Sequence, residues 1–211
     1  MSARALTIVG LGDSTTAGTP GFLSPLEVPP DGSGDSESQY AHWMRTAHPE
    51  WTVLNRGVDG ERSDGIRARF ERDVLGERPD YVIVLAGVND LHEGRPVASV
   101  QAHLAAMYAE AIDAGIVPVA ATVLPYDEAT RPVSAAIWEL NDWIKFVAAS
   151  LGIPYCDTHA AVADPEDPTR LRGSPDGLHP DVEGYRRMGE ALARAIEADL
   201  ARRAHPTSRP D

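Results

Sequence analysis

The chain has 211 residues, and its 19 Lys and Arg against 32 Asp and Glu give a formal net charge of -13. This length suits one domain with a substantial core, and a surface so negative would repel nucleic acid and anionic membranes. No run reaches the roughly 18 apolar residues of a membrane-spanning helix, and the single cysteine, Cys156, excludes an intramolecular disulfide. We therefore predict one domain over 1–203, a flexible polar tail over 204–211, and no nucleic-acid or integral membrane partner.

The first apolar run, Ala5 to Thr16, stops abruptly at Gly12-Asp13-Ser14. A short apolar run bounded by glycines is typical of a buried strand, and open α/β sheets bind ligands just past the carboxyl ends of their strands. Ser14 is therefore predicted to lie at such a site, where it is a weak nucleophile unless a base takes its proton. The run lacks the long apolar core and the cleavage site of a signal peptide, so we expect a cytoplasmic protein.

Two segments of different regularity follow the serine. Residues 18–38 are rich in glycine and proline and lack periodicity, which predicts a long surface loop that either shapes the substrate entrance or has no role. A short helix over 39–47 and a strand over 51–54 come next, followed by a polar turn over 55–60.

The pattern of strand, turn and helix then repeats. Ser63 is predicted to cap a helix whose apolar residues 66, 70 and 74 recur at helical spacing. The continuous apolar run 81–86 indicates a strand buried on both faces. Further helices are expected over 97–112, 137–151 and 182–200, and further strands over 116–123 and 153–156.

This alternation of strands and helices predicts the fold class. Strands that alternate with helices form a parallel sheet with helices on both faces. We predict a three-layer α/β/α sandwich with a five-stranded parallel sheet. The turns after the first three strands then meet at one edge, which brings together Ser14, Gly57 and Asn89.

Asp176 and His179 supply the base that Ser14 needs. They lie three residues apart just before the last predicted helix, so the carboxylate can hold one imidazole nitrogen while the other faces the serine. The negative tetrahedral intermediate requires hydrogen-bond donors, and the candidates are the Ser14 and Gly57 backbone N–H groups and the Asn89 side-chain amide. The sequence therefore predicts a Ser-His-Asp triad with an oxyanion hole.

Other polar residues near the predicted strand ends have simpler interpretations. His159 lies two residues after Asp157 and is the rival base, although an ordinary polar strand end explains this pair more simply. Asp13 and Asp90 are interpreted as carboxylates that brace loops by accepting backbone N–H bonds. The remaining histidines lack the carboxylate spacing of a metal site, so no metal is predicted.

Four segments resemble the four sequence blocks of the GDSL, or SGNH, hydrolases, in the order of that family. They are Gly12-Asp13-Ser14-Thr15, Asn55-x-Gly57-x-x-Gly60, Gly87-x-Asn89-Asp90 and Asp176-x-x-His179-Pro180, with Thr15 in place of the leucine that gives the family its name. The resemblance covers residues 5 to about 200 and implies a flavodoxin-like fold, no cofactor and an esterase, lipase or related acylhydrolase activity. It also implies the roles of the site residues: Ser14 as nucleophile, His179 as base, Asp176 as its orienting acid, and Ser14, Gly57 and Asn89 as the oxyanion hole.

Three functions remain open at this point. The first is hydrolysis of a small-molecule acyl ester through an acyl-enzyme, with short acyl groups favoured because the sequence shows no long amphipathic lid helix. The second is acyl transfer to an alcohol by the same triad. The third is a non-catalytic, flavodoxin-like module that binds a phosphate or nucleotide at Gly10-Leu11-Gly12 and Ser14-Thr15-Thr16.

Overall fold

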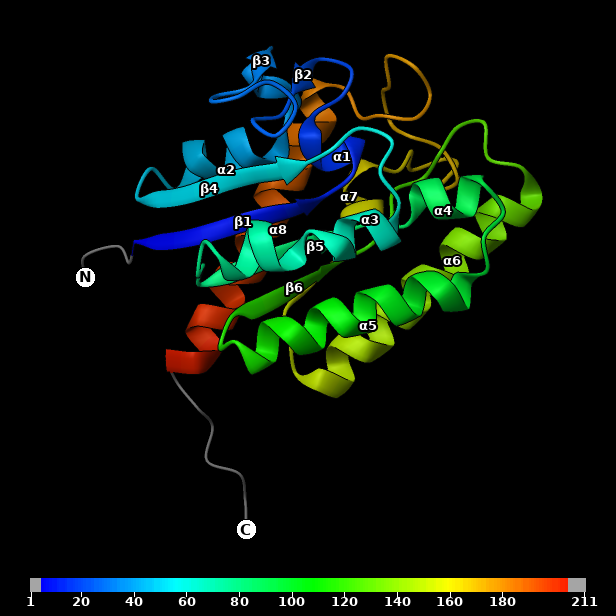
Figure 1. Cartoon of the computed structure of the whole chain (residues 1–211). Coiled ribbons are helices and arrows are strands. Elements are labelled where there is room, and N and C mark those ends of the chain that lie inside the picture. The colour runs from blue at the N-terminus through cyan, green and yellow to red at the C-terminus, as the bar shows by residue number, and fades with distance from the viewer. Residues whose placement is uncertain (1–4, 205–211) are drawn as a thin grey trace.

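A sheet of five parallel strands forms the centre of the fold (Figure 1). The structure is a computed structural model, and it describes residues 5–204. The strands are β1 (Leu6–Gly12), β4 (Trp51–Gly57), β5 (Tyr81–Leu85), β6 (Val117–Ala121) and β7 (Tyr155–Cys156). They lie in the order β4, β1, β5, β6, β7. The chain thus adds β4 on one side of β1 and the later strands on the other side, so the direction in which strands are added reverses at β1. Open α/β sheets bind their ligands beside such a point, at the carboxyl ends of the strands.

Helices cover both faces of this sheet (Figure 1). On one face pack α3 (Ser63–Ala68), α5 (Val97–Asp113) and α6 (Arg131–Leu151), and on the other α2 (Tyr40–Ala47), α7 (Thr158–Val162) and α8 (Val182–Ala204). Shorter helical segments in the described chain are α1 (Ser14–Ala17), α4 (Val88–His92), the 3-10 helix η1 (Ser36–Ser38) and the π-helical η2 (Glu71–Leu75). The predicted three-layer α/β/α sandwich with a five-stranded parallel sheet is confirmed.

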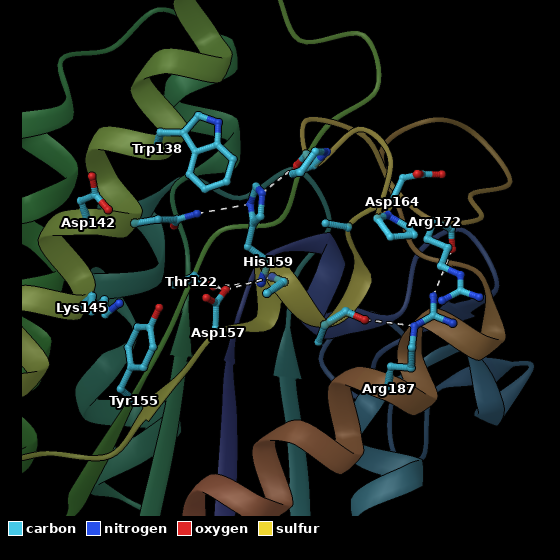
Figure 2. A pocket seen from close by; sticks show the side chains of 16 residues that line it. Thr122, Trp138, Asp142, Lys145, Tyr155, Asp157, His159, Asp164, Arg172 and Arg187 are labelled. Carbon is cyan, nitrogen blue, oxygen red and sulfur yellow. Dashed lines mark hydrogen bonds between the residues drawn. The ribbon is translucent and has the colours of Figure 1, made fainter.

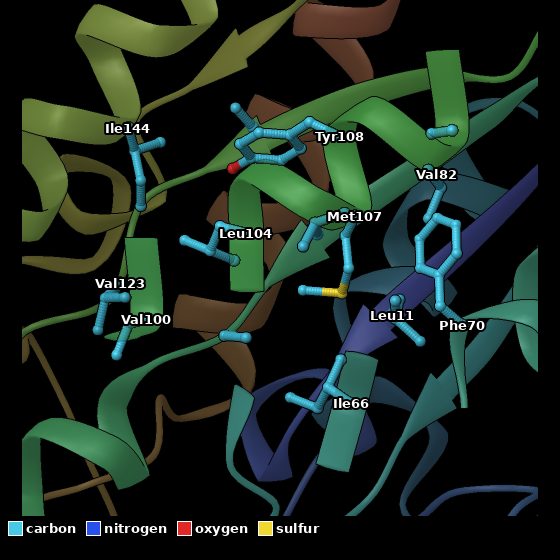
Figure 3. Close-up of a cluster of buried hydrophobic side chains, with 14 of the residues drawn as sticks. Leu11, Ile66, Phe70, Val82, Val100, Leu104, Met107, Tyr108, Val123 and Ile144 are labelled. Atoms are coloured by element: carbon cyan, nitrogen blue, oxygen red, sulfur yellow. The ribbon is translucent and has the colours of Figure 1, made fainter. Parts of the chain in front are cut away.

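Two apolar cores lie between the layers, because side chains alternate across each strand. Ile8 and Ile83 face α2, α7 and α8, whereas Val9 and Val84 face α3, α5 and α6, and all four are fully buried. Figure 3 shows the second of these cores, to which α5 contributes Met107. Burial on both faces is the reason why the apolar run of β5 is continuous.

β1 and its two neighbours in the sheet, β4 and β5, are in register at their carboxyl ends. Gly12 of β1 lies opposite Gly57 of β4 and Leu85 of β5. Glycine is required at position 57, because a Cβ there would lie 2.1 Å from the Ala17 nitrogen and 2.6 Å from the Thr16 carbonyl carbon. This close approach packs α1 directly against the end of β4. The turns after β1, β4 and β5 therefore meet at one edge of the sheet, as predicted.

The segment over 18–38 is more regular than the predicted loop. It contains a small antiparallel pair, β2 (Phe22–Leu23) with β3 (Ser33–Gly34), followed by η1. Ser24 in this segment is fully buried, and its hydroxyl donates to the Gly57 carbonyl at 2.6 Å. The segment is thus joined to the end of β4, beside the predicted site.

Two predictions of local structure are wrong. Residues 55–57 were expected in a turn but extend β4, because they pair with residues 10–12 of β1. Ser63 does not cap α3; it is the first helical residue, and its N–H and hydroxyl each donate to a carboxylate oxygen of Asp90 at 2.8 Å. The acceptor comes from α4, which a pattern of neighbouring residues cannot reveal. Asp90 accepts a backbone N–H, as predicted, but from the first residue of a helix and not from a loop.

The described chain ends in α8, which includes Ala204. The first residue of the predicted tail is therefore helical, and the rest of that tail, 205–211, lies outside the described residues. Between residues 5 and 204, none of the helices combines the length and the apolar character needed to cross a membrane.

Candidate active site

A tight turn from strand to helix holds Ser14 at the carboxyl end of β1. Ser14 is the first residue of α1, and Asp13 caps this helix by accepting the Thr15 N–H on Oδ1 at 3.0 Å. Gly18 ends the helix with a φ of 112°, in the left-handed region that favours glycine. Ser14 is buried, and its backbone N–H is one of the donors that a helix start leaves without an intrahelical partner. Ser14 therefore lies at the reversal of strand order.

Asp176 and His179 form a hydrogen-bonded pair in the loop before α8. Asp176 Oδ2 lies 2.7 Å from His179 Nδ1, and Asp176 Oδ1 accepts the N–H groups of Leu178 and His179 at 3.0 and 2.8 Å. Burial pushes the pKa of the Asp176 carboxyl upward, but the hydrogen bonds from His179 and Leu178 outweigh it and hold the pKa below its usual value. The ionised carboxylate fixes the orientation of the imidazole.

The other imidazole nitrogen, His179 Nε2, is buried and has no hydrogen-bond partner among residues 5–204. A neutral imidazole that donates its Nδ1 proton to a carboxylate carries an unprotonated Nε2, which is the state of a general base. Leu178 lines a small cavity together with Asp13 and Thr15, so this segment lies against the turn that carries Ser14. The described structure therefore brings the pair to the serine turn without forming the hydrogen bond from Ser14 to Nε2, a contact that often tightens only with substrate bound.

The predicted oxyanion donors differ in whether another group of the protein already accepts their N–H. Asn89, in α4, donates one N–H of its side-chain amide to the Glu61 carbonyl at 2.9 Å, and a second amide N–H remains for a ligand. The Gly57 N–H donates to Asn55 Oδ1 at 2.9 Å, so an oxyanion would have to share it. Gly57 is therefore the weakest of the three donors in this conformation.

Asp13 is a buried carboxyl beside the serine, and it braces the turn as predicted. Burial raises its pKa from 3.8 to about 7; the hydrogen bonds from Thr15 oppose this shift, and the charges of Asp90 and Glu61 add to it. A carboxyl whose pKa is raised by folding binds its proton more tightly in the folded chain. Its contribution to stability is therefore complete below the unfolded pKa and is lost as the pH rises to about 7.

We expect Asp13→Asn, which keeps a helix-capping side chain but cannot ionise, to gain stability relative to the wild type as the pH rises. The gain in the free energy of unfolding, relative to the wild type, develops between about pH 4 and pH 7 and is constant above pH 7. A pKa shift from 3.8 to about 7 corresponds to on the order of 4 kcal/mol. Urea unfolding of both proteins across this range measures the difference in the free energy of unfolding. If the difference in the free energy of unfolding between the two proteins did not depend on pH, the pKa of Asp13 would not be raised by folding.

His159, the rival base, has a structural role. Its Nδ1 lies 2.9 Å from the Val123 carbonyl oxygen, and its Nε2 lies 2.9 Å from the Pro168 carbonyl oxygen. Because both ring nitrogens contact carbonyl oxygens, neither is free to take a proton from a nucleophile. Asp157 caps α7 by accepting the Ala160 N–H at 2.9 Å. Elsewhere within residues 5–204, no group of three or more His, Cys, Asp or Glu side chains could hold a metal ion.

A larger cavity lies at the ends of β6 and β7 (Figure 2). It encloses about 580 Å³, and its lining includes Trp138, which is 42% exposed, and Arg187. No residue of the predicted triad or oxyanion hole lines it. Part of its polar lining is already engaged, since Arg187 donates to the carbonyl groups of Ala161 and Arg172. The predicted catalytic residues therefore lie outside this cavity.

Arg69, which is not among the predicted site residues, is a buried arginine beside the predicted oxyanion donors. Its side chain is 8% exposed and donates to the Gly12 carbonyl at 2.8 Å. The available signal was the spacing of Arg69 and Asp73, an i,i+4 pair of opposite charge next to the apolar residues 66, 70 and 74. Such a pair is usually a solvated one, and only the fold shows that it is buried.

One family model matches most of this chain, and two curated relatives match shorter parts of it. A family model described as the GDSL-like Lipase/Acylhydrolase family matches residues 11–187. The chain is 30% identical to the uncharacterized lipoprotein YqeF of Bacillus subtilis (strain 168) over 116 residues, covering 45% of this chain and 48% of that protein. It is 34% identical to an acetylxylan esterase of Geobacillus stearothermophilus over 50 residues, 23% of each chain. The chain thus spans about half or less of the length of these curated relatives.

Solved structures match more completely. A protein assigned to the G-D-S-L lipolytic family from Desulfitobacterium hafniense DCB-2 is 28% identical, with a TM-score of 0.75 over 90% of this chain and 98% of that one. The acetylxylan esterase of Geobacillus stearothermophilus is 24% identical, with a TM-score of 0.71 over 92% and 95%, which shows a shared fold. Because the family model matches well over half of the residues, the chain belongs to the GDSL-like lipase/acylhydrolase family.

Proposed function

We propose that the chain is a serine esterase that hydrolyses short-chain carboxylic esters through an acyl-enzyme on Ser14. The observation that supports this most strongly is the Asp176–His179 pair, whose Nε2 is buried, has no partner within residues 5–204 and belongs to a segment packed on the Ser14 turn. Such a pair is the acid–base half of a serine triad. Membership of the acylhydrolase family supports the same class of reaction.

In the acylation step, His179 Nε2 takes the Ser14 hydroxyl proton while Ser14 Oγ attacks the ester carbonyl carbon. The tetrahedral oxyanion accepts hydrogen bonds from the Ser14 N–H, from the free amide N–H of Asn89 and from the shared Gly57 N–H. The carbon–oxygen double bond then re-forms, and the ester's alkoxide leaves with the proton from His179. Asp176 stays ionised and stabilises the imidazolium that forms in between.

Water hydrolyses the acyl-enzyme in the deacylation step. His179 Nε2 takes a proton from the water, the oxygen attacks the acyl carbon, and the same donors hold the second oxyanion. Collapse of this intermediate breaks the bond to Ser14 Oγ, which recovers its proton from His179. The carboxylic acid leaves, and the enzyme returns to its starting state.

The preference for short acyl groups is supported by the packing of the long helices. Between residues 5 and 204, the long helices α5, α6 and α8 all pack against the sheet, so none of them is a lid that would shield a fatty-acid groove. Since one relative is an acetylxylan esterase, we place acetyl esters first among the substrates.

The phosphate-binding alternative receives no support from the glycines that suggested it. A Cβ on Gly10 would lie 2.5 Å from the Tyr40 hydroxyl, and one on Gly12 would lie 2.4 Å from the Leu85 carbonyl oxygen. Packing within the protein therefore explains both glycines. Acyl transfer uses the same triad with an alcohol in place of water, so the test of function has to separate the two reactions.

A series of p-nitrophenyl esters from acetate to palmitate, with fluorophosphonate labelling in parallel, tests the proposal. We expect covalent labelling of Ser14, the highest kcat/KM for acetate or butyrate, and free acid as the main product when an alcohol is added. A maximum at palmitate would overturn the short-acyl preference, and an alkyl ester as main product would favour the transferase. Turnover without labelling of Ser14 would overturn the serine mechanism.

A further inference from the structure

Arg69 lies where the segments that carry the oxyanion donors meet. It follows α3, and its guanidinium is buried among four acceptors. Nε donates to Glu61 Oε2 at 2.7 Å, Nη2 to the Gly12 carbonyl at 2.8 Å, and Nη1 to the Arg56 carbonyl at 2.8 Å and Asp73 Oδ2 at 2.9 Å. One side chain therefore joins the carboxyl ends of β1 and β4.

The bond to Arg56 acts on the peptide unit of a predicted donor. The Arg56 carbonyl and the Gly57 N–H belong to the same peptide, which is planar and has these two groups pointing in opposite directions. A hydrogen bond that holds the oxygen therefore also fixes the direction of the N–H. Asn55 Oδ1 receives that N–H on the other side, at 2.9 Å, so the peptide is held from both ends.

Arg69 reaches the second donor through Glu61. The Glu61 carboxylate binds Arg69 Nε, and the main-chain carbonyl of the same residue accepts Asn89 Nδ2 at 2.9 Å. Holding one N–H of an amide fixes its plane and aims its other N–H. Glu61 thus connects the guanidinium to the Asn89 amide.

We propose that Arg69 is a positioning residue for the oxyanion hole, which orients the Gly57 N–H and the Asn89 amide without touching the substrate. This inference rests on the proposed esterase function. Glu61 and Asp73 pair with the guanidinium, and Arg72 also binds Asp73, so two carboxylates face two cations and the contribution of Arg69 is geometric. The planar fork of an arginine can hold several carbonyl and carboxylate oxygens at fixed angles, whereas a lysine ammonium supplies a point charge on a flexible stem.

The test compares Arg69→Gln, Arg69→Lys and a matched control, Arg45→Gln, in hydrolysis of p-nitrophenyl acetate. Arg45 also donates to a carbonyl of β4, that of Val53 at 2.8 Å, but this bond holds neither the Gly57 peptide nor Glu61. Loss of one oxyanion donor typically lowers kcat by about 10²- to 10³-fold. We expect Arg69→Gln to lower kcat by about 10²-fold with KM changed less than about threefold, Arg69→Lys to lower it less, and Arg45→Gln to leave it unchanged.

A double-mutant cycle with Asn89→Ala separates positioning from general destabilisation. If Arg69 acts through Asn89, Arg69→Gln lowers kcat by a smaller factor in the Asn89→Ala background than in the wild type. Factors that multiply fully would overturn the connection through Glu61. Circular dichroism and the melting temperature give the folded fraction of each variant, and if Arg69→Gln does not fold, Arg69→Lys carries the comparison.

The outcomes distinguish this inference from the proposed function. A wild-type protein that neither hydrolyses the ester nor is labelled at Ser14 overturns the function, and the role of Arg69 with it. An active wild type whose folded Arg69 variants keep the wild-type kcat, or lose it only in proportion to the unfolded fraction, overturns the positioning role alone.

Discussion

Replacement of Ser14 by alanine is expected to lower kcat for p-nitrophenyl acetate by on the order of 10⁴- to 10⁶-fold. The substitution removes the oxygen that forms the acyl-enzyme, so only the oxyanion donors and substrate binding remain to assist direct attack by water. Initial rates and fluorophosphonate labelling measure the loss, and both signals should disappear together. The fold should be retained, because alanine is favourable in a helix and the backbone N–H of residue 14 is unchanged.

Ser150→Ala is the matched control for this substitution. Ser150 also lies in a helix, α6, where its hydroxyl donates to the Phe146 carbonyl at 2.9 Å. It makes no contact with the predicted site, so the wild-type rate is expected. If Ser14→Ala hydrolysed the ester as fast as Ser150→Ala, another group would have to be the nucleophile.

Replacement of His179 by alanine should have an effect of similar size. Without the imidazole, no group removes the Ser14 proton or returns it to the leaving alkoxide. Asp176→Asn keeps the imidazole but removes the carboxylate that orients it at 2.7 Å, so we expect a smaller loss, on the order of 10⁴-fold. Initial rates of the three proteins give this order directly.

The double variant Ser14→Ala with His179→Ala shows whether the two residues work as a unit. Triad members are strongly non-additive, so the double variant should be no slower than either single one. His42→Ala, on α2 beside Trp43, is the control for loss of an imidazole and should keep the wild-type rate. Losses that multiply would mean that the two side chains act in separate steps, against the triad.

Features that depend on periodicity or on short spacing could be predicted from the sequence. The apolar run of β5 predicts a strand buried on both faces, and all five of its residues are buried. Asp176 and His179 are close enough along the chain for the loop itself to pair them, with the backbone N–H of His179 bonded to the same carboxylate. The meeting of the turns after β1 and β4 followed from the parallel order of the strands alone.

Features that depend on contacts between distant segments could not be predicted. Arg69 binds a carbonyl 57 residues away, and Asp90 caps a helix 27 residues away, and neither pairing leaves a local pattern. Helix α1 has only four residues, too few for helical periodicity to show. The sequence offered Gly57 as a free donor, whereas its N–H is engaged by Asn55, a contact that depends on the rotamer of a side chain.

The central claim is that His179 activates Ser14, and mass spectrometry of the trapped acyl-enzyme tests it most directly. The wild type and His179→Ala are mixed with p-nitrophenyl acetate, quenched in acid within the first turnovers and digested. We predict one acetyl group on the peptide that contains Ser14 in the wild type and none in His179→Ala. Acetylation of a different residue in the wild type, or equal acetylation of Ser14 in both proteins, would contradict the account.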